Sequence, residues 1–178
     1  NISNSATSYA NTPAAGTDVG PAAQSDGGWL TTFNDSSNSS DSGQSVAKDN
    51  SGNLYIAGYT NNGSNSDILV RKYNSAGTIQ WTKYYNSPAN SIDVGYGIAV
   101  DGSGNVYVTG YEARPDIGQN NNIWVRKYDT NGLVQWTTTY NDPNNNQDYG
   151  NSIAVDGSAN VFVTGYETIT GQGANIWV

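Results

Sequence analysis

The chain has 178 residues, contains neither cysteine nor histidine, and carries a formal net charge of −8 at pH 7. This length suffices for one domain with a hydrophobic core. Without cysteine and histidine, the chain cannot form disulfides, ordinary zinc sites, or Ser-His-Asp and Cys-His catalytic centres. The acidic balance argues against a nucleic-acid partner. No apolar run approaches the ~20 residues of a membrane span, so we expect none.

Residues 1–27 are rich in Ser, Asn, Ala, Gly and Thr and show no hydrophobic periodicity. This composition predicts an extended polar arm without a core of its own. If the arm is ordered, a neighbouring chain is the expected support. Because the sequence starts at Asn1 rather than Met, we expect a processed product whose leader was removed.

A motif that begins with Asn, continues through apolar and β-branched residues and ends on Gly-Tyr occurs three times. It spans residues 53–59, 105–111 and 160–166. Trp29 and Trp81 are 52 residues apart, Trp81 and Trp136 are 55 apart, and the glycines of the motif keep both spacings. Spacings shared by independent landmarks indicate an internal repeat.

Each repeat holds four segments of strand character, and turns rich in Gly, Asn and Ser follow the first and the third. Four antiparallel strands in about 50 residues are typical of a β-propeller blade. We therefore predict an all-β fold over residues 28–178. The blades are expected at about residues 35–86, 87–141 and 142–178, with the N-terminal strand at 28–34 completing a C-terminal blade.

The run from Ile98 to Tyr111, followed by the run from Ile123 to Trp136, resembles the bacterial "seven-bladed β-propeller" repeat family of secreted and surface proteins. The resemblance covers roughly residues 28–178. It implies a propeller on a secreted, extracellular or cell-surface protein, and it brings no catalytic residue with it. Only three repeats are present, whereas closed propellers usually have 4–8 blades.

The two ends of the repeat region are out of phase. The third repeat reaches only its third strand at Ile176 and Trp177, and a lone fourth strand containing Trp29, Leu30 and Phe33 precedes the first repeat. Because an unpaired edge strand drives association, we expect these residues to join copies of the chain by strand exchange. Three arrangements remain open: a six-bladed ring of two chains, a head-to-tail filament, and a piece of a longer propeller.

Asp49, Asp101 and Asp156 open the turn after the first strand of each repeat. One hypothesis is that each accepts hydrogen bonds from the amides of its own turn. The other is a cation site, with Ca²⁺ as the ion that suits carboxylate and carbonyl oxygens. The turn explanation is favoured, because every blade needs a turn whereas a site is usually needed once. A second series, Asp41, Asp93 and Asp148, stands eight residues earlier and could ring a channel mouth.

The recurring tryptophans are expected to pack between blades rather than to stack on carbohydrate. Arg71 and Arg126 are expected to pair with carboxylates of the next blade or to be solvated. The sequence thus predicts no enzyme and no cofactor, but an extracellular structural protein that assembles with its own copies, with a filament subunit as one form. The alternatives are a propeller module that binds a glycan or Ca²⁺, and a fragment of a larger secreted propeller protein or enzyme.

Overall fold

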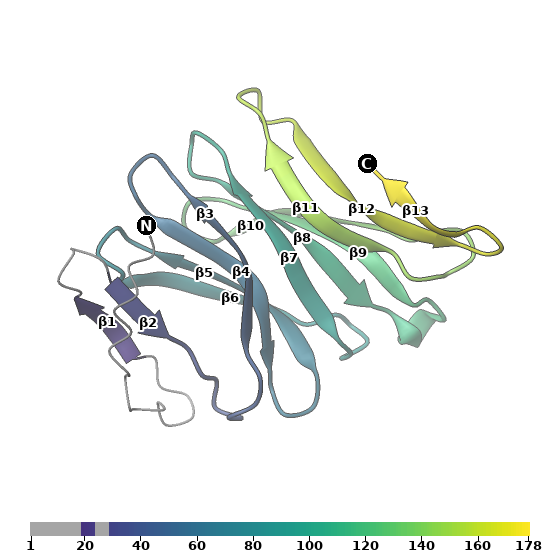
Figure 1. The fold of residues 1–178 in the computed structure, drawn as a ribbon, viewed down its shortest axis with the longest axis horizontal. Coiled ribbons are helices and arrows are strands. Elements are labelled where there is room, and N and C mark those ends of the chain that lie inside the picture. Colours follow the sequence, from purple (N-terminus) through teal and green to yellow (C-terminus); the bar gives the residue numbers. More distant parts are fainter. Residues whose placement is uncertain (1–18, 24–28) are drawn as a thin grey trace.

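The computed structural model describes residues 19–23 and 29–178. Figure 1 shows three twisted antiparallel sheets in a row, which we call blade one, blade two and blade three. Blade one consists of β3 (Ser42–Lys48), β4 (Leu54–Asn61), β5 (Ser66–Tyr73) and β6 (Ile79–Tyr85). Blade two consists of β7 (Asp93–Val100), β8 (Val106–Ala113), β9 (Asn121–Tyr128) and β10 (Val134–Tyr140), with a 3₁₀ turn at Pro115–Ile117. Blade three consists of β11 (Tyr149–Val155), β12 (Val161–Ile169) and β13 (Gly173–Trp177).

The strands of each blade follow one another in chain order, so every blade is a simple meander. This arrangement confirms the predicted all-β fold with four antiparallel strands in a complete blade. The connections are short, and glycine or a residue that tolerates positive φ closes the turns. Gly104 and Gly132, for example, have φ values of 82° and 76°.

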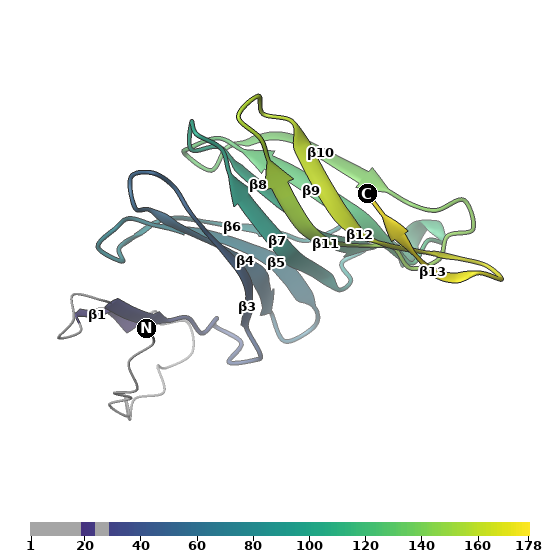
Figure 2. The ribbon, with the colours of Figure 1, turned by 45° about the horizontal axis from the view of Figure 1, so that its top comes forward.

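The N-terminal strand β2 (Trp29–Thr32) does not complete the C-terminal blade within one chain. It pairs instead with β1 (Val19–Ala23), and blade three remains a three-stranded sheet among the described residues. The reason is distance along the row: β2 and β13 lie at opposite ends of the molecule in both views (Figures 1 and 2). Part of the predicted polar arm therefore forms a strand, and the rest of that arm lies outside the described residues.

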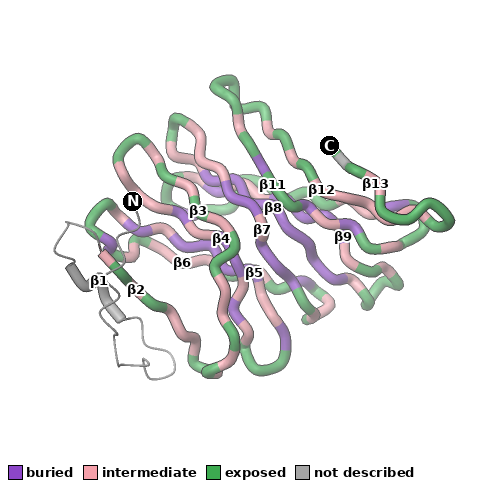
Figure 3. Tube along the Cα trace, in the orientation of Figure 1, coloured by how far each residue is buried: buried purple, intermediate pink, exposed green. Residues whose placement is uncertain are grey.

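The hydrophobic core consists of two layers of side chains between neighbouring blades. One layer joins Tyr55 and Ile68 of blade one to Val108 and Trp124 of blade two. The second layer joins blade two to blade three around Tyr107, Ile123, Val125 and Ile153. Buried positions accordingly concentrate in blade two, which has a neighbour on each face (Figure 3), and every residue of β8 is buried.

The glycine of the Gly-Tyr motif is required by a close backbone approach. In each blade the register between the first two strands shifts by one residue beside this glycine. A Cβ added at Gly110 would overlap the carbonyl oxygen of Val94, and additions at Gly58 and Gly165 would meet the equivalent carbonyls of Ser42 and Tyr149. A bulge of this kind increases the local twist, and only glycine fits opposite it.

We therefore predict that Gly110→Ala lowers the free energy of unfolding by about 3 kcal/mol, because the added methyl group must displace backbone atoms. The matched control is Gly102→Ala, since a Cβ there has no atom within 4 Å. Denaturant unfolding of both variants measures the difference. Equal stability of the two variants would contradict the close approach.

Candidate assembly interface

The three turn aspartates lie in three separate turns, and each carboxylate is occupied by its own turn. Asp101 accepts hydrogen bonds from the Ser103 and Asn105 backbone N–H groups, both at 2.9 Å, and from the Asn105 side chain at 2.7 Å. The Tyr107 hydroxyl donates a fourth bond at 3.0 Å. Asp49 repeats all four contacts, and Asp156 repeats the three that come from Ser158 and Asn160.

These hydrogen bonds favour the ionised form of the turn carboxylates. Burial alone would raise the pKa of Asp101, but the hydrogen bonds from Asn105, Tyr107 and Ser103 outweigh it, and the pKa lies below its usual value. Within residues 19–23 and 29–178, no group of three or more His, Cys, Asp or Glu side chains is arranged to hold a metal ion. The geometry at these turns is that of a hydrogen-bonded cap.

The second aspartate series connects chain segments rather than gathering at a channel mouth. Asp93 accepts hydrogen bonds from the Ser87 N–H at 2.6 Å and the Ala113 N–H at 3.0 Å, and it thereby joins the loop before β7 to the end of β8. Asp41 and Asp148 make the equivalent pair of bonds in their own blades. Each aspartate thus holds the connection between two blades in place.

Asp93 is fully buried, and this burial raises its pKa to about 6. The two backbone N–H groups oppose the shift, whereas the negative charge of Glu112 adds to it. Glu112 itself accepts a hydrogen bond from Tyr85 and lies 3.6 Å from the Arg114 guanidinium.

This raised pKa predicts a pH dependence of stability. Between pH values of about 4 and 6 the folded chain retains a proton on Asp93 that the unfolded chain has lost, so the free energy of unfolding falls as the pH rises. Asp93→Asn should reduce this slope, although it also costs stability at every pH; burial also raises the pKa values of Asp67 and Asp148, which supply the remainder. In the control Asp116→Asn the slope should remain, because Arg114 holds the pKa of Asp116 below its usual value. Urea titrations across this pH range would contradict the assignment if Asp93→Asn keeps the same slope as Asp116→Asn.

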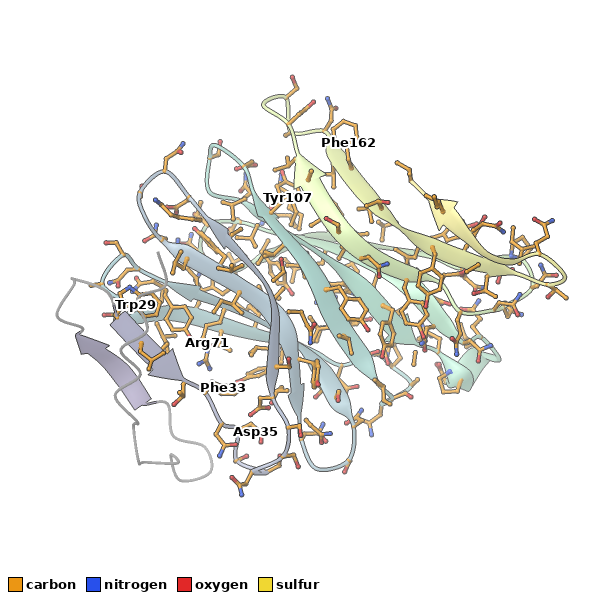
Figure 4. The ribbon with its side chains drawn as sticks, viewed as in Figure 1. Trp29, Phe33, Asp35, Arg71, Tyr107 and Phe162 are labelled. Atoms are coloured by element: carbon orange, nitrogen blue, oxygen red, sulfur yellow. The ribbon has the colours of Figure 1, made fainter. Side chains whose placement is uncertain are left out.

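The N-terminal residues 29–33 lie against blade one in the same way that β6 lies against blade two. The rings of Trp29 and Tyr73 are 5.4 Å apart, and those of Trp81 and Tyr128 are 6.2 Å apart. Figure 4 shows Trp29, Phe33 and Arg71 at this end of the row. Residues 29–33 therefore occupy the place of an outer strand that belongs to a blade before blade one.

The paired arginines support this assignment through a contact that the sequence analysis did not predict. The Arg71 guanidinium lies 4.2 Å from the centre of the Phe33 ring, and the Arg126 guanidinium lies 4.3 Å from that of Tyr85. Arg71 is buried, and its Nε donates to the Thr82 hydroxyl at 2.9 Å. A guanidinium over an aromatic face is a favourable contact, and here it joins one blade to the outer strand of the blade before it.

The other predicted assembly residues lie at the opposite end. β13 pairs along one edge with β12, and no described strand pairs along its other edge. Ile176 is exposed, as is Leu30 on β2. The backbone of Trp177 pairs with Gly165, whereas the Trp177 side chain lies outside the described part of the structure. The structure thus places the two groups at separate ends and does not bring them together within one chain.

Comparison with known proteins identifies the repeat. The Beta-propeller repeat family matches residues 29–64, 80–111 and 135–166, which together exceed half of the chain. Each matched segment starts at an outer strand and runs into the second strand of the following blade, so the first match includes β2 as an outer strand. No curated protein matches the sequence.

Among the described residues, no helix has the length and apolar character needed to cross a membrane. Each of the three matched segments contains the first strand and all or most of the second strand of one of the three blades, which confirms the resemblance to a propeller repeat. The chain belongs to the Beta-propeller repeat family.

Proposed function

We propose that this polypeptide is a non-catalytic structural module that joins further copies of itself by β-strand exchange. One observation carries the proposal: residues 29–33 occupy the place of an outer strand of a blade before blade one, while β13 offers an open edge for a strand of that kind. A row of unpaired backbone N–H and C=O groups is a template for another strand.

The repeat gives the register of the proposed pairing. Tyr85 pairs with Ile68 in blade one, and Tyr140 pairs with Ile123 in blade two. The residues at the equivalent positions are Phe33 and Ile176. Phe33 of one copy is therefore expected opposite Ile176 of another, which places Thr31 opposite Val178.

Trp29 supplies a side chain that suits this exchange. In the interior of the row, Trp81 contacts Tyr55 of its own blade at 6.1 Å and Tyr128 of the next blade at 6.2 Å. Trp29 already contacts Tyr73, the equivalent of Tyr128. Strand exchange would add the other contact, with Phe162 of a second copy at the position equivalent to Tyr55.

β1 pairs with one edge of β2, and we infer that this is the edge that an incoming β13 would need. Ala23 pairs with Trp29, Ala22 with Leu30 and Val19 with Thr32, with a register shift between Val19 and Ala22. In the proposed register Thr32 pairs with Trp177 instead. β1 contains Pro21, which has no N–H to donate, so it covers the edge with fewer hydrogen bonds than a regular strand. β1 is therefore a weaker partner for β2 than β13 of a second copy, which can displace it.

The exchange is heterologous, because one end of a copy meets the other end of the next. Such a contact produces a closed ring when the rotation per copy fits, and a filament when it does not. The composition supports an extracellular or cell-surface setting, since the chain has few lysines and is rich in Asn, Ser, Thr and Gly. In such a setting the module would serve as a building unit of a larger assembly.

Thiol cross-linking tests the register. The chain contains no cysteine, so Thr31→Cys combined with Val178→Cys introduces a single pair. We expect disulfide-linked oligomers under mild oxidation, with the two positions joined in peptide mass spectra. The control pair is Leu30→Cys with Val178→Cys, one residue out of register. Equal cross-linking of the two pairs, or none in either, contradicts the proposed exchange.

Two truncations test the role of β1. Deletion of residues 1–23 removes the competing strand but keeps residues 29–33, so association should become tighter by about tenfold or more. Deletion of residues 1–34 removes the donated strand and should leave monomers. Sedimentation velocity over a concentration series measures both. If the two truncations behave alike, β1 does not compete with β13.

A further inference from the structure

The outward faces of blade one and blade three resemble the two sides of the internal blade contacts. We infer that these faces are the two halves of one blade-to-blade interface, at which blade three of one copy docks on blade one of a second copy, with Ile176 entering a pit at Gly43. The inference rests on the proposed function in taking a second copy as the partner. It adds a side-chain contact that strand exchange alone does not require.

Blade three exposes side chains whose equivalents are buried in the other two blades. Tyr55, Ile68 and Val70 of blade one are fully buried against blade two, and their equivalents Tyr107, Ile123 and Val125 are buried against blade three. The same positions of blade three are Phe162, Ile176 and Val178, with exposed fractions of 54%, 86% and 85%. An apolar group that is covered twice and exposed once marks the side of an interface whose partner is not among the described residues.

Blade one shows the complementary half. Val46 is 64% exposed, whereas its equivalent in blade two, Ile98, is 7% exposed. Leu54 and Ile56 are half-buried, whereas their equivalents Val106 and Val108 are completely buried under blade one. A cleft of about 220 Å³ opens on this face and is lined by Phe33, Ile56, Leu69 and other residues.

The internal interfaces share one close contact between an isoleucine and a glycine. A Cβ added at Gly95 of blade two would lie 3.1 Å from the Ile68 Cγ2 atom of blade one and 3.2 Å from the Gly58 carbonyl oxygen. A Cβ added at Gly150 of blade three would overlap the Thr109 hydroxyl of blade two and would also meet the Ile123 Cγ2 atom at the same 3.1 Å and the Gly110 carbonyl oxygen at 3.2 Å. Each blade thus inserts an isoleucine methyl where the next blade has no side chain.

Gly43 is the equivalent glycine of blade one, and no isoleucine of another blade fills its pit among the described residues. Gly43 is exposed, whereas Gly95 and Gly150 are buried. A Cβ added at Gly43 would have one neighbour among the described atoms, the Ile56 Cγ2 atom at the ordinary contact distance of 3.5 Å. Nothing within the described fold therefore requires glycine at this position. A blade docked from a second copy would require it, because the isoleucine side chain needs the space.

These contacts favour blade three of a second copy as the partner of the exposed face of blade one. The internal interfaces fill the glycine pit with an isoleucine of the third strand, and blade three presents Ile176 at that position on an exposed edge. A second copy also brings Phe162 and Val178 to the apolar face around Val46. The new interface would continue the internal one, with the same residue types at the same positions of the repeat.

A double-mutant cycle tests this docking. Gly43→Val should weaken self-association at least about tenfold, because the added methyl groups fill the space of the Ile176 side chain. Ile176→Ala should weaken it less, and the double variant should associate more tightly than Gly43→Val alone, because the smaller side chain leaves room for valine. Gly102→Ala is the control and should match the wild type. Sedimentation velocity gives the dissociation constants, and thermal unfolding checks that each variant is folded.

The outcomes separate the two proposals. Weakening by Gly43→Val with recovery in the double variant supports the docking. Cross-linking of the Thr31→Cys, Val178→Cys variant, together with self-association that Gly43→Val leaves unchanged, overturns the docking and leaves strand exchange in place. Weakening without recovery in the double variant overturns the contact between Ile176 and Gly43. A wild-type chain that stays monomeric, together with no cross-link in the Thr31→Cys, Val178→Cys variant, overturns both proposals.

Discussion

The packing of one blade face against the next is the interaction on which the structure depends. An antiparallel sheet buries its apolar side chains only when a second layer covers them. In this chain the apolar side chains of neighbouring blades form the two core layers, and glycines at Gly95 and Gly150 let the sheets approach closely. The repeat therefore specifies a blade and also the surface that the next blade must match.

A row of three blades satisfies this requirement twice and leaves two faces without a partner blade among the described residues. Blade two is enclosed on both sides, whereas Val46 of blade one and Phe162 of blade three are exposed. The outer strand at residues 29–33 is already packed on blade one by the contacts of Trp29 and Phe33. Strand exchange and face docking would thus be two aspects of one contact, in which the strand completes a blade and the face covers it.

The strands, the hairpin turns and the blade order were predictable from the sequence, because each is encoded locally by the Gly-Tyr motif and the Asp-initiated turns. The role of the turn aspartates followed from the same logic. The partner of β2 was not predictable, since β1 lacks hydrophobic periodicity and contains Pro21. The bonds of Asp93 and the stacking of Arg71 on Phe33 connect residues far apart in the sequence, and a repeat pattern does not show which distant groups meet. The significance of Gly43 emerged only by comparison with its buried equivalents.

The central claim is that the two ends of the module are complementary and meet between copies. Hydrogen–deuterium exchange measured over a range of protein concentrations tests it most directly, because the free edge of β13 and the strand at residues 29–33 would change partners on association. The account predicts that the amides of β13 gain protection as the concentration rises, while those of the enclosed strand β8 do not change. Exchange of β13 amides that is independent of concentration would contradict it.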